Sequence, residues 1–476
     1  MMEIQSQPES NKNDVSHSIF DKIVGIIDIK TILFLLLALH LLVIQNPAKS
    51  LVFDEAYYVP AARDILNGVS SNPEHPFLGK AWISLGIATF GDNWFGWRIV
   101  PVSFSLLSLI VFYFVSKKFL GEKLATYSTA LLGFENIFFI HGSLALLEIP
   151  SIFFFFLSFW LLYERGNRKF LRIPLFYWLS ALMMGLSFLS KETAAFYIIS
   201  IMFFYISRVR YTKYKELIPK LVKGFVILLF IGMVYFIPVT AYDIYYKPSS
   251  SVHVLETHTI INLSDENGVI TGTTTLTNTT TIRSIINNGL DHLIYAVSYA
   301  SGLKITNTSK DINSGNYAWN WILPIPSYPP SPYYIENAEV KHTITENDKV
   351  ISVTTDTKHP IAWYGIGNLP IWWSIWFIVP FSIFNIIKKK AKDIDYFLLI
   401  FTAGTYLPML YISVIGSRIV YPFYFVQTVP ILAIGIPHII NSFINNKTLK
   451  DIILYLFLII VLTFFVMYFP LRINEL

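Results

Sequence analysis

The sequence predicts a mainly α-helical, polytopic membrane protein of about eleven transmembrane helices, with a small, mainly β insert outside the membrane. Three observations predict this class. Hydrophobic residues make up 54% of the 476 residues and charged residues only 14%, which is too little polar surface for a soluble protein of this length. Apolar runs recur at about the 20 residues that span a bilayer core. One long segment between such runs is instead rich in Thr, Asn and Ser.

The expected membrane helices fall into two groups, separated by that polar segment. They lie near residues 29–45, 98–116, 124–141, 149–163, 173–190, 193–207, 224–242, 368–387, 394–412, 421–440 and 451–470. Because their number is odd, the two termini are expected on opposite sides of the membrane. The first apolar run follows a polar stretch without a cleavage-site pattern, so we interpret it as a signal anchor.

The distribution of lysine and arginine predicts the orientation. Most of the 36 Lys and Arg residues lie in the N-terminal tail and in alternate short connections, at 117–123, 165–172, 208–223, 388–392 and 447–450. Cytoplasmic loops carry the excess of positive charge in membrane proteins. We therefore expect a cytoplasmic N-terminus, and an extracytoplasmic C-terminus on the side of the long connections.

This topology divides the chain into three parts. They are an N-terminal transmembrane half with a first outer loop, an extracytoplasmic insert and a C-terminal group of helices, at residues 1–242 (loop 46–97), 243–367 and 368–476. In the insert, the alternation from Val350 to Thr354 predicts a strand, and Asn347-Asp348 predicts a turn. Three N-x-S/T triplets, the acceptor pattern for N-glycans, begin at Asn262, Asn278 and Asn307.

Composition also limits which binding partners and cofactors are expected. A net charge of +5 is mild, so nucleic acid is not an expected partner, whereas the lipid bilayer is. The chain has no cysteine, which excludes disulfides and thiolate metal sites. We predict no required cofactor or metal. A divalent ion held by Asp54, Glu55 and His75 stays an open alternative, because carboxylate and imidazole groups are suitable ligands.

Ionisable residues gather at the expected outer ends of the helices. The first outer loop and the later outer helix ends carry Asp54, Glu55, Tyr57, Arg63, His75, Lys80, Arg98, Glu148, Lys191 and Arg418. Acids and cations held together at one membrane surface are a functional-site hypothesis, because burying such groups costs free energy. A transporter is a weaker alternative, since its charges usually lie near the bilayer midplane and its helices form inverted repeats.

Each of these residues also has a structural interpretation. Asp54 and Glu55 begin an expected helix, where a cap and an acid in the first turn both stabilise. Arg98 and Arg418 are typical anchors at lipid headgroups. The remaining candidates have equally ordinary roles: a loop residue for His75, a surface ion pair for Lys191 with Glu192, and a helix start for Glu148 ahead of Pro150.

Several motifs, in order along the chain, resemble the protein O-mannosyltransferase family. They are Asp54-Glu55 after the first helix, His75-Pro76-Phe77-Leu78-Gly79-Lys80, Phe95 to Arg98, Gly185 to Lys191, Gly367 to Trp373 and Tyr421 to Pro430. Phe77 stands where the family has a second proline, and Glu148 where its members usually carry Asp. The β-trefoil domain of the eukaryotic members has no counterpart. A looser similarity connects the chain to bacterial enzymes that move sugars from polyprenyl phosphate to lipids.

The resemblance implies a GT-C-like fold and an inverting glycosyltransferase. Its donor would be a polyprenyl (dolichyl) phosphate hexose, most plausibly mannose, and its acceptor an extracytoplasmic hydroxyl, on protein Ser/Thr or alternatively on a lipid or lipid-linked glycan. The oligomeric state stays open. Asp54 is the expected general base, with Glu55 beside it. Arg98 and Lys191 are the first choices to stabilise the leaving phosphate, with Arg63, Lys80 and Arg418 as candidates. Further site candidates are His75, Glu148 and Tyr57.

Overall fold

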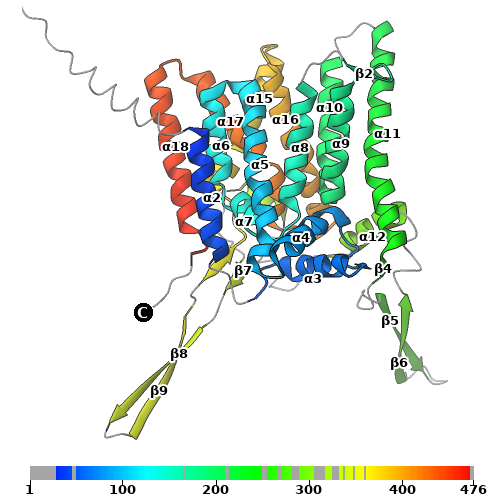
Figure 1. Ribbon diagram of the computed structural model, residues 1–476, viewed down its shortest axis with the longest axis vertical. Coiled ribbons are helices and arrows are strands. Elements are labelled where there is room, and N and C mark those ends of the chain that lie inside the picture. Colours follow the sequence, from blue (N-terminus) through cyan, green and yellow to red (C-terminus); the bar gives the residue numbers. More distant parts are fainter. Residues whose placement is uncertain are drawn as a thin grey trace, which may run out of the picture.

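The protein is a bundle of apolar helices that run roughly parallel to one another (Figure 1). The computed structural model describes residues 28–45, 50–163, 168–209, 214–248, 255–264, 270–280, 289–304, 317–323, 332–335, 338–346, 349–358 and 361–471. The long upright helices of the first half are α2 (Ile29–Gln45), α5 (Trp94–Leu120), α6 (Glu122–Gly133), α8 (Glu148–Tyr163), α9 (Leu175–Ser190), α10 (Ala195–Val209) and α11 (Tyr214–Tyr245). Those of the second half are α15 (Ile375–Ile387), α16 (Asp393–Val414), α17 (Val429–Phe443) and α18 (Lys447–Met467).

Shorter helices lie across one end of the bundle. Figure 1 shows α3 (Glu55–Leu66), α4 (Phe77–Phe90) and α12 (Gly289–Gly302) lying across the lower ends of the upright helices. The short helices α7 (Asn136–Ser143) and α14 (Leu369–Trp373) and the 3-10 turns η1 (Glu192–Ala194), η3 (Ala318–Trp321) and η4 (Pro422–Gln427) complete the helical elements. This lower end carries the candidate site.

The basic connections lie at the opposite end. The turns that join α5 to α6, α8 to α9 and α15 to α16 are at the top of Figure 1, away from α3 and α4. Lys117 and Lys123 lie in the adjoining ends of α5 and α6, and Arg168 and Lys388 lie in the other two connections. The two ends of the bundle therefore differ in charge as the sequence predicts. The assignment of the basic end to the cytoplasm stays a prediction.

Helix length and composition identify a membrane protein. Among the described residues, five helical stretches are long and apolar enough to cross a membrane: Trp94–Leu120, Leu217–Tyr245, Leu369–Ile387, Asp393–Val414 and Lys447–Met467. A sixth forms if α7 and α8, which meet at an angle of 111°, count as one broken span. α2, α9 and α17 are apolar but shorter. The protein is thus a mainly helical integral membrane protein, while the count of about eleven spans remains a prediction.

Two of the expected helices are interrupted, one at a polar side chain and the other ahead of a proline. The expected helix at 124–141 is α6 followed by α7, because the Glu135 side chain caps α7 by accepting from the Phe138 N–H. The expected helix at 421–440 begins as the turn η4, and α17 starts only at Val429, with Pro430 in its first turn. Both breaks bring loop backbone to the lower end, beside the candidate site.

The strands of the expected insert form separate two-stranded sheets. β5 (Leu255–Ser264) pairs with β6 (Ile270–Thr280), β8 (Ala338–Glu346) with β9 (Lys349–Lys358), and β7 (Pro332–Ile335) with β10 (Ala362–Tyr364), all antiparallel. Four more short strands form two further pairs: β1 (Val69–Ser70) pairs in parallel with β4 (Lys247–Pro248), and β2 (Lys169–Phe170) pairs antiparallel with β3 (Ile173–Pro174). The predicted turn at Asn347-Asp348 lies outside the described residues. A single β insert, and the three-part division of the chain, stay predictions.

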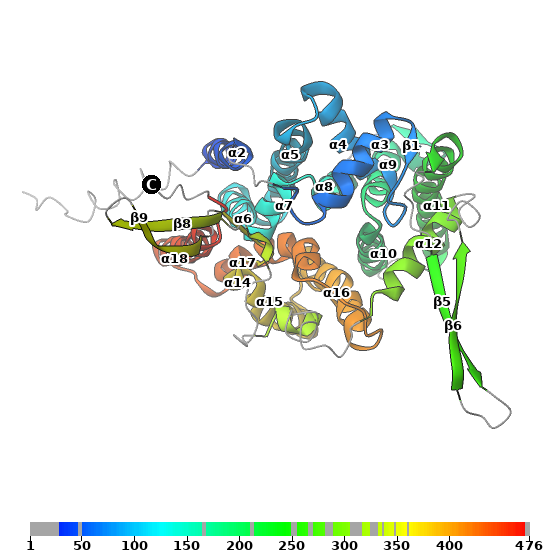
Figure 2. The ribbon, with the colours of Figure 1, turned by 90° about the horizontal axis from the view of Figure 1, so that it is seen from below.

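Aromatic packing connects α8 to α10 of the first half and to α16 of the second half. Phe155 of α8 stacks on Tyr197 of α10 with ring centroids 3.7 Å apart, and Phe401 of α16 packs against Phe155 at 5.6 Å. Figure 2, viewed from below, shows α8 and α10 on one side of this contact and α16 and α17 on the other. Aromatic contacts of this kind hold the outer helix ends in fixed relative positions.

Candidate active site

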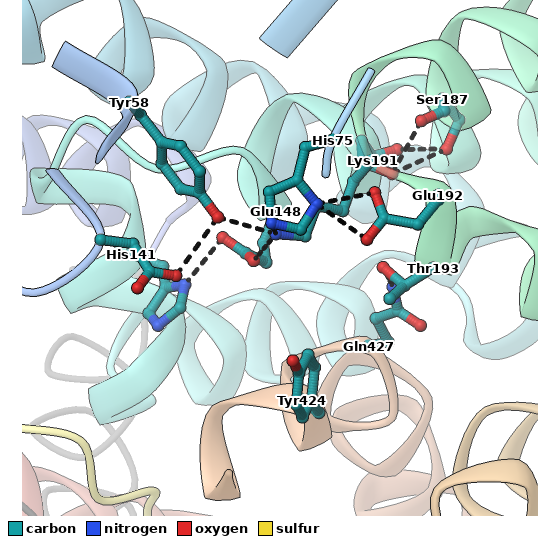
Figure 3. A network of polar contacts seen from close by, with 12 residues as sticks. Tyr58, His75, His141, Glu148, Ser187, Lys191, Glu192, Thr193, Tyr424 and Gln427 are labelled. Carbon is teal, nitrogen blue, oxygen red and sulfur yellow. Dashed lines mark hydrogen bonds and ion pairs between the residues drawn. The ribbon is translucent and has the colours of Figure 1, made fainter. Parts of the chain in front are cut away.

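A buried lysine forms the centre of a polar cluster at the lower end of the bundle (Figure 3). Lys191 follows the last residue of α9, and its side chain is 2% exposed. Its Nζ lies 3.1 Å from Glu148 Oε1 and donates a hydrogen bond to the Tyr58 hydroxyl at 3.1 Å. Burial alone would lower the pKa of Lys191, but Glu148, Glu192 and Asp54 raise it above its usual value. The ammonium therefore stays charged at neutral pH.

Asp54 faces this lysine through Tyr58. The Tyr58 hydroxyl donates to Asp54 Oδ2 at 3.2 Å, so a hydrogen-bonded chain runs from Lys191 through Tyr58 to the carboxylate. Burial raises the pKa of Asp54, and the positive charge of Lys191 partly opposes that rise. Asp54 occupies the N-cap position of α3, yet within the described part of the chain its side chain makes no capping hydrogen bond. Helix capping therefore does not explain why an aspartate stands at this position.

The residue before Asp54 has a strained backbone. Phe53 has φ of +54°, a left-handed conformation that costs free energy for a bulky side chain. Its ring stacks on the ring of Tyr333 with centroids 4.1 Å apart and meets Phe423 edge-on at 5.3 Å. Strain of this kind persists where the surroundings over-determine the conformation, and it often marks functional sites.

A second acid–base pair borders the cluster. His75 Nδ1 lies 2.9 Å from Glu192 Oε1, and His75 Nε2 lies 3.5 Å from Lys191 Nζ. Burial alone would raise the pKa of Glu192, but the neighbouring His75 and Lys191 lower it to about 2. Lys191 and Glu192 are therefore not a local surface pair, because each interacts with a residue distant in the sequence.

A histidine and a tyrosine close the cluster on the side of Glu148. His141 Nδ1 lies 3.3 Å from Glu148 Oε2, and His141 Nε2 lies 2.9 Å from the Tyr333 hydroxyl. Glu148 thus interacts with His141 through one oxygen and with Lys191 through the other. Glu148 is the first residue of α8, as expected for an acid at a helix start. That structural role does not account for its contacts with His141 and Lys191.

Two polar side chains from the second half of the chain face the same cluster. Tyr424 of η4 accepts from Arg418 Nη2 at 3.5 Å, and the Arg418 guanidinium lies 5.7 Å from the centroid of the Tyr424 ring. Gln427 donates to Thr193 Oγ1 at 2.5 Å. Among the described residues, the buried Gln427 Oε1 has no hydrogen-bond partner. In the same part of the chain, the buried Nε of Arg418 also has no hydrogen-bond partner, so a cation and an amide oxygen here can bind a further group.

Glu55, the neighbour of Asp54, lies in a closed ion pair. Arg98 Nε and Nη2 donate to the two Glu55 oxygens at 2.8 and 2.7 Å, and both side chains are 0% exposed. The backbone N–H groups of Val52 and Ala145 also donate to Glu55, at 3.0 and 2.9 Å. Four donors satisfy this carboxylate, and the pair ties the start of α3 to α5 and to the break between α7 and α8.

Three other predicted residues lie outside the cluster. Arg63 pairs with Asp92 at the surface, at 2.9 Å. Lys80 is buried, and its ammonium donates to the backbone oxygens of Ser71, Asn72 and His75 at 3.2, 2.6 and 2.9 Å. Burial lowers the pKa of Lys80 to about 8. Tyr57 is 60% exposed, one position before the tyrosine that belongs to the cluster. No group of three His, Asp or Glu able to hold a metal is found in the described ranges.

The sequence comparisons match part of this region. The family model described as Dolichyl-phosphate-mannose-protein mannosyltransferase matches residues 74–237, which include His75, Glu148 and Lys191. The resemblance predicted from the sequence is confirmed. The polyprenol-phosphate-mannose–protein mannosyltransferase of Corynebacterium glutamicum is 30% identical over 125 residues, which is 23% of this chain and 24% of that protein. The enzyme of the same name from Mycobacterium tuberculosis is 33% identical over 111 residues, 22% of this chain and 21% of the relative.

A solved structure extends the likeness to the whole fold. The structure of the Saccharomyces cerevisiae protein O-mannosyltransferase Pmt1-Pmt2 complex bound to the sugar donor matches with a TM-score of 0.62. The match covers 93% of this chain and 90% of that one, at 11% sequence identity. The chain therefore has the fold of a protein O-mannosyltransferase chain, whereas the curated relatives are matched over only about a quarter of their length.

Proposed function

We propose that this protein is an inverting glycosyltransferase that moves a hexose, mannose, from a polyprenyl phosphate to an extracytoplasmic hydroxyl on protein Ser/Thr. The observation that carries the proposal is the hydrogen-bonded chain from Lys191 through Tyr58 to Asp54. It places a charged lysine and a partly buried carboxylate on the two sides of one tyrosine, at one end of the bundle. The family similarity of residues 74–237 supports the donor class.

Asp54 acts as the general base in this proposal. It takes the proton of the acceptor hydroxyl while the acceptor oxygen attacks the anomeric carbon of the donor. The bond from that carbon to the phosphate oxygen breaks, and the configuration inverts. A raised pKa makes Asp54 a stronger base than an ordinary aspartate, provided that the pH keeps it ionised. Tyr58 holds the carboxylate in place through its hydrogen bond.

Lys191 stabilises the leaving polyprenyl phosphate. Charge grows on the phosphate in the transition state, so a fixed cation binds it more strongly there than in the ground state. Glu148 and His75 hold the ammonium in position before the donor arrives. Arg418 is the second cation for this role, because it contacts Tyr424 at the edge of the same cluster.

Arg98 and Glu55 have a positioning role instead. Glu55 takes two of the nitrogen donors of Arg98, and both side chains are fully buried. Among the described residues, Arg98 Nη1 has no hydrogen-bond partner, but a donor phosphate bound to Nε or Nη2 would have to displace Glu55 and leave its charge buried without a partner, which is costly. The pair ties the start of α3 to α5 and to the segment between α7 and α8.

The membrane topology fits a lipid donor. With the basic turns in the cytoplasm, the cluster lies at the extracytoplasmic surface, where the polyprenyl chain of a donor can remain between the helices. The exposed face of α11, which carries Phe225, Met233, Ile237 and Ile244, is part of the lipid-facing surface in this orientation.

A transfer assay with purified protein tests this function. Detergent-solubilised protein receives polyprenyl-phosphate-mannose with labelled sugar, together with a Ser/Thr-rich peptide or, separately, a lipid-linked glycan. We expect label in the peptide with the wild type and with Asp64→Asn, the same substitution at the other end of α3. Asp54→Asn is expected to lower transfer by about 10²- to 10⁴-fold. Label only in the glycan would move the acceptor to that class, and no use of any polyprenyl-phosphate sugar would refute the proposal.

A further inference from the structure

The insert sends one antiparallel ribbon into the candidate site. β7 pairs with β10, and β8 and β9, which follow β7 and precede β10 in the sequence, pair with each other. Figure 1 shows β8 and β9 projecting away from the bundle, while β7 lies against the lower ends of the helices. We name the strands β7 to β10 the arm. The arm therefore connects a projecting hairpin to the cluster.

The base of the arm contacts the cluster through Tyr333. The Tyr333 hydroxyl lies 2.9 Å from His141 Nε2, and the Tyr333 ring stacks on Phe53 with an interplanar angle of 12°. Gly365, directly after β10, packs its backbone against the same ring, and a Cβ at that position would overlap the ring carbons. The segment directly after β10 thus also confines the Tyr333 ring, because a residue without a side chain stands where the ring lies.

Both contacts of Tyr333 lead to residues of the proposed reaction. Phe53 is in the left-handed conformation and is bonded directly to Asp54, so the orientation of Asp54 depends on the Phe53 backbone. His141 in turn interacts with Glu148, which holds Lys191. These two contacts join Tyr333 to neighbours of Asp54 and Lys191, and not to Asp54 or Lys191 directly. Its effect would pass through Phe53 and His141.

We infer that Tyr333 is a positioning residue for the transfer step: it clamps Phe53 in its left-handed conformation and so directs Asp54 into the cluster. This inference rests on the proposed function for its kinetic test. It assigns the base of the arm to the catalytic site. The stack is the main component, because it acts on the residue next to Asp54, and the hydrogen bond to His141 is the smaller one.

Substitutions at Tyr333 and Phe53 separate positioning from folding. Tyr333→Phe keeps the stack, so kcat should fall no more than about threefold, within the loss of one hydrogen bond. Tyr333→Ala removes the stack, and kcat should fall about a hundredfold with an unchanged KM for donor, as for an ångström-scale displacement of a reacting group. Tyr334→Phe, at the neighbouring position of β7, is the matched control and should behave as wild type.

A rescue variant tests the clamp itself. Glycine adopts the left-handed conformation without strain, so Phe53→Gly in the Tyr333→Ala background should recover about tenfold in kcat. Hydrogen exchange of residues 52–58 gives a readout that needs no substrate. It should become faster in Tyr333→Ala and return toward the wild-type rate in the double variant.

The outcomes distinguish the inference from the proposed function. A wild-type protein that transfers sugar, with Tyr333→Ala equally active per folded molecule, overturns the inference and leaves the function standing. A Tyr333→Ala defect that Phe53→Gly does not relieve in either readout also overturns it. If the wild type transfers no sugar, the proposed function fails, and the exchange of residues 52–58 still decides whether Tyr333 clamps Phe53.

Discussion

Asp54 and Glu55 are neighbours in the sequence, yet they lie in opposite environments. Glu55 is fully buried and accepts four hydrogen bonds, two of them from Arg98. Asp54 is partly exposed, and within the described ranges its carboxylate accepts one side-chain hydrogen bond, from Tyr58. Successive residues at a helix start do not face each other, so a shift of one position sends one carboxylate into the bundle and the other toward the cluster.

The difference indicates how to separate a structural acid from a reactive one. A carboxylate whose oxygens are saturated by fixed donors has no remaining capacity to accept a proton or a substrate hydroxyl. A carboxylate with a raised pKa and one weak partner keeps that capacity. We therefore propose that the pair of Glu55 and Arg98 supports the fold and that Asp54 takes part in the reaction. The following predictions test this division, from the largest expected effect to the smallest.

Removing one member of the closed pair should mainly damage stability. Arg98→Ala leaves the Glu55 charge buried without its cation, which costs about 3–5 kcal/mol. We expect a large fall in the thermal unfolding midpoint or a loss of folded protein. Size-exclusion profiles and unfolding curves in detergent measure it, and the double variant Arg98→Met with Glu55→Gln should recover part of the loss. A stable Arg98→Ala protein with impaired donor turnover would restore Arg98 as a phosphate ligand.

Removing the central cation should mainly damage turnover. Lys191→Met is expected to lower single-turnover transfer by about 10²- to 10³-fold, the usual cost of losing one fixed group that stabilises developing charge. Lys191→Arg keeps the charge and should retain more activity than the methionine variant. Rates are compared per folded molecule, because Glu148 also loses its partner. Equal activity of Lys191→Met and wild type would exclude Lys191 from the reaction.

The pH dependence of transfer should report the raised pKa of Asp54. A general base works when deprotonated, so the rate should rise with pH as Asp54 loses its proton. Because burial raises that pKa, the acid limb should lie above pH 3.8, the ordinary value for aspartate. Rates from pH 3.5 to 8 at saturating donor measure the limb. A rate that is already maximal at pH 3.8 would contradict the assignment.

The smallest effect is expected at the surface pair. Arg63→Ala breaks the contact with Asp92, where both side chains are well exposed, and such pairs contribute about 0–1 kcal/mol. We expect unchanged transfer and a shift in the unfolding midpoint of no more than a few degrees. A large fall in donor turnover would return Arg63 to the list of phosphate ligands.

The sequence was sufficient to find the cluster because charged residues at the ends of apolar helices are rare and costly. Asp54, His75, Glu148 and Lys191 were predicted in this way, and the structure brings them together. The roles of Glu55 and Arg98 were not predictable, since they depend on which way two adjacent side chains point. Tyr58 had a usable signal, because it lies four residues after Asp54 and therefore on the same helix face.

The residues missed altogether come from distant parts of the chain. Tyr333 reaches His141 across 192 positions of sequence, and no local pattern marks it among the other aromatic residues of its segment. The same holds for the break before α7, where Glu135 also accepts from the N–H of Asn368, 233 positions away. Periodicity predicts where helices lie, but long-range hydrogen bonds of this kind decide where they break.

The most direct test compares Asp54→Asn and Glu55→Gln in one experiment. Both substitutions remove one charge at nearly constant volume, at adjacent positions. Each variant is purified in the same detergent, and its unfolding midpoint and its single-turnover transfer from polyprenyl-phosphate-mannose are measured on the same sample. We predict that Asp54→Asn keeps the wild-type midpoint and loses transfer, whereas Glu55→Gln loses stability and keeps most of its transfer per folded molecule. A stable Glu55→Gln protein without transfer, beside an active Asp54→Asn protein, would contradict the account.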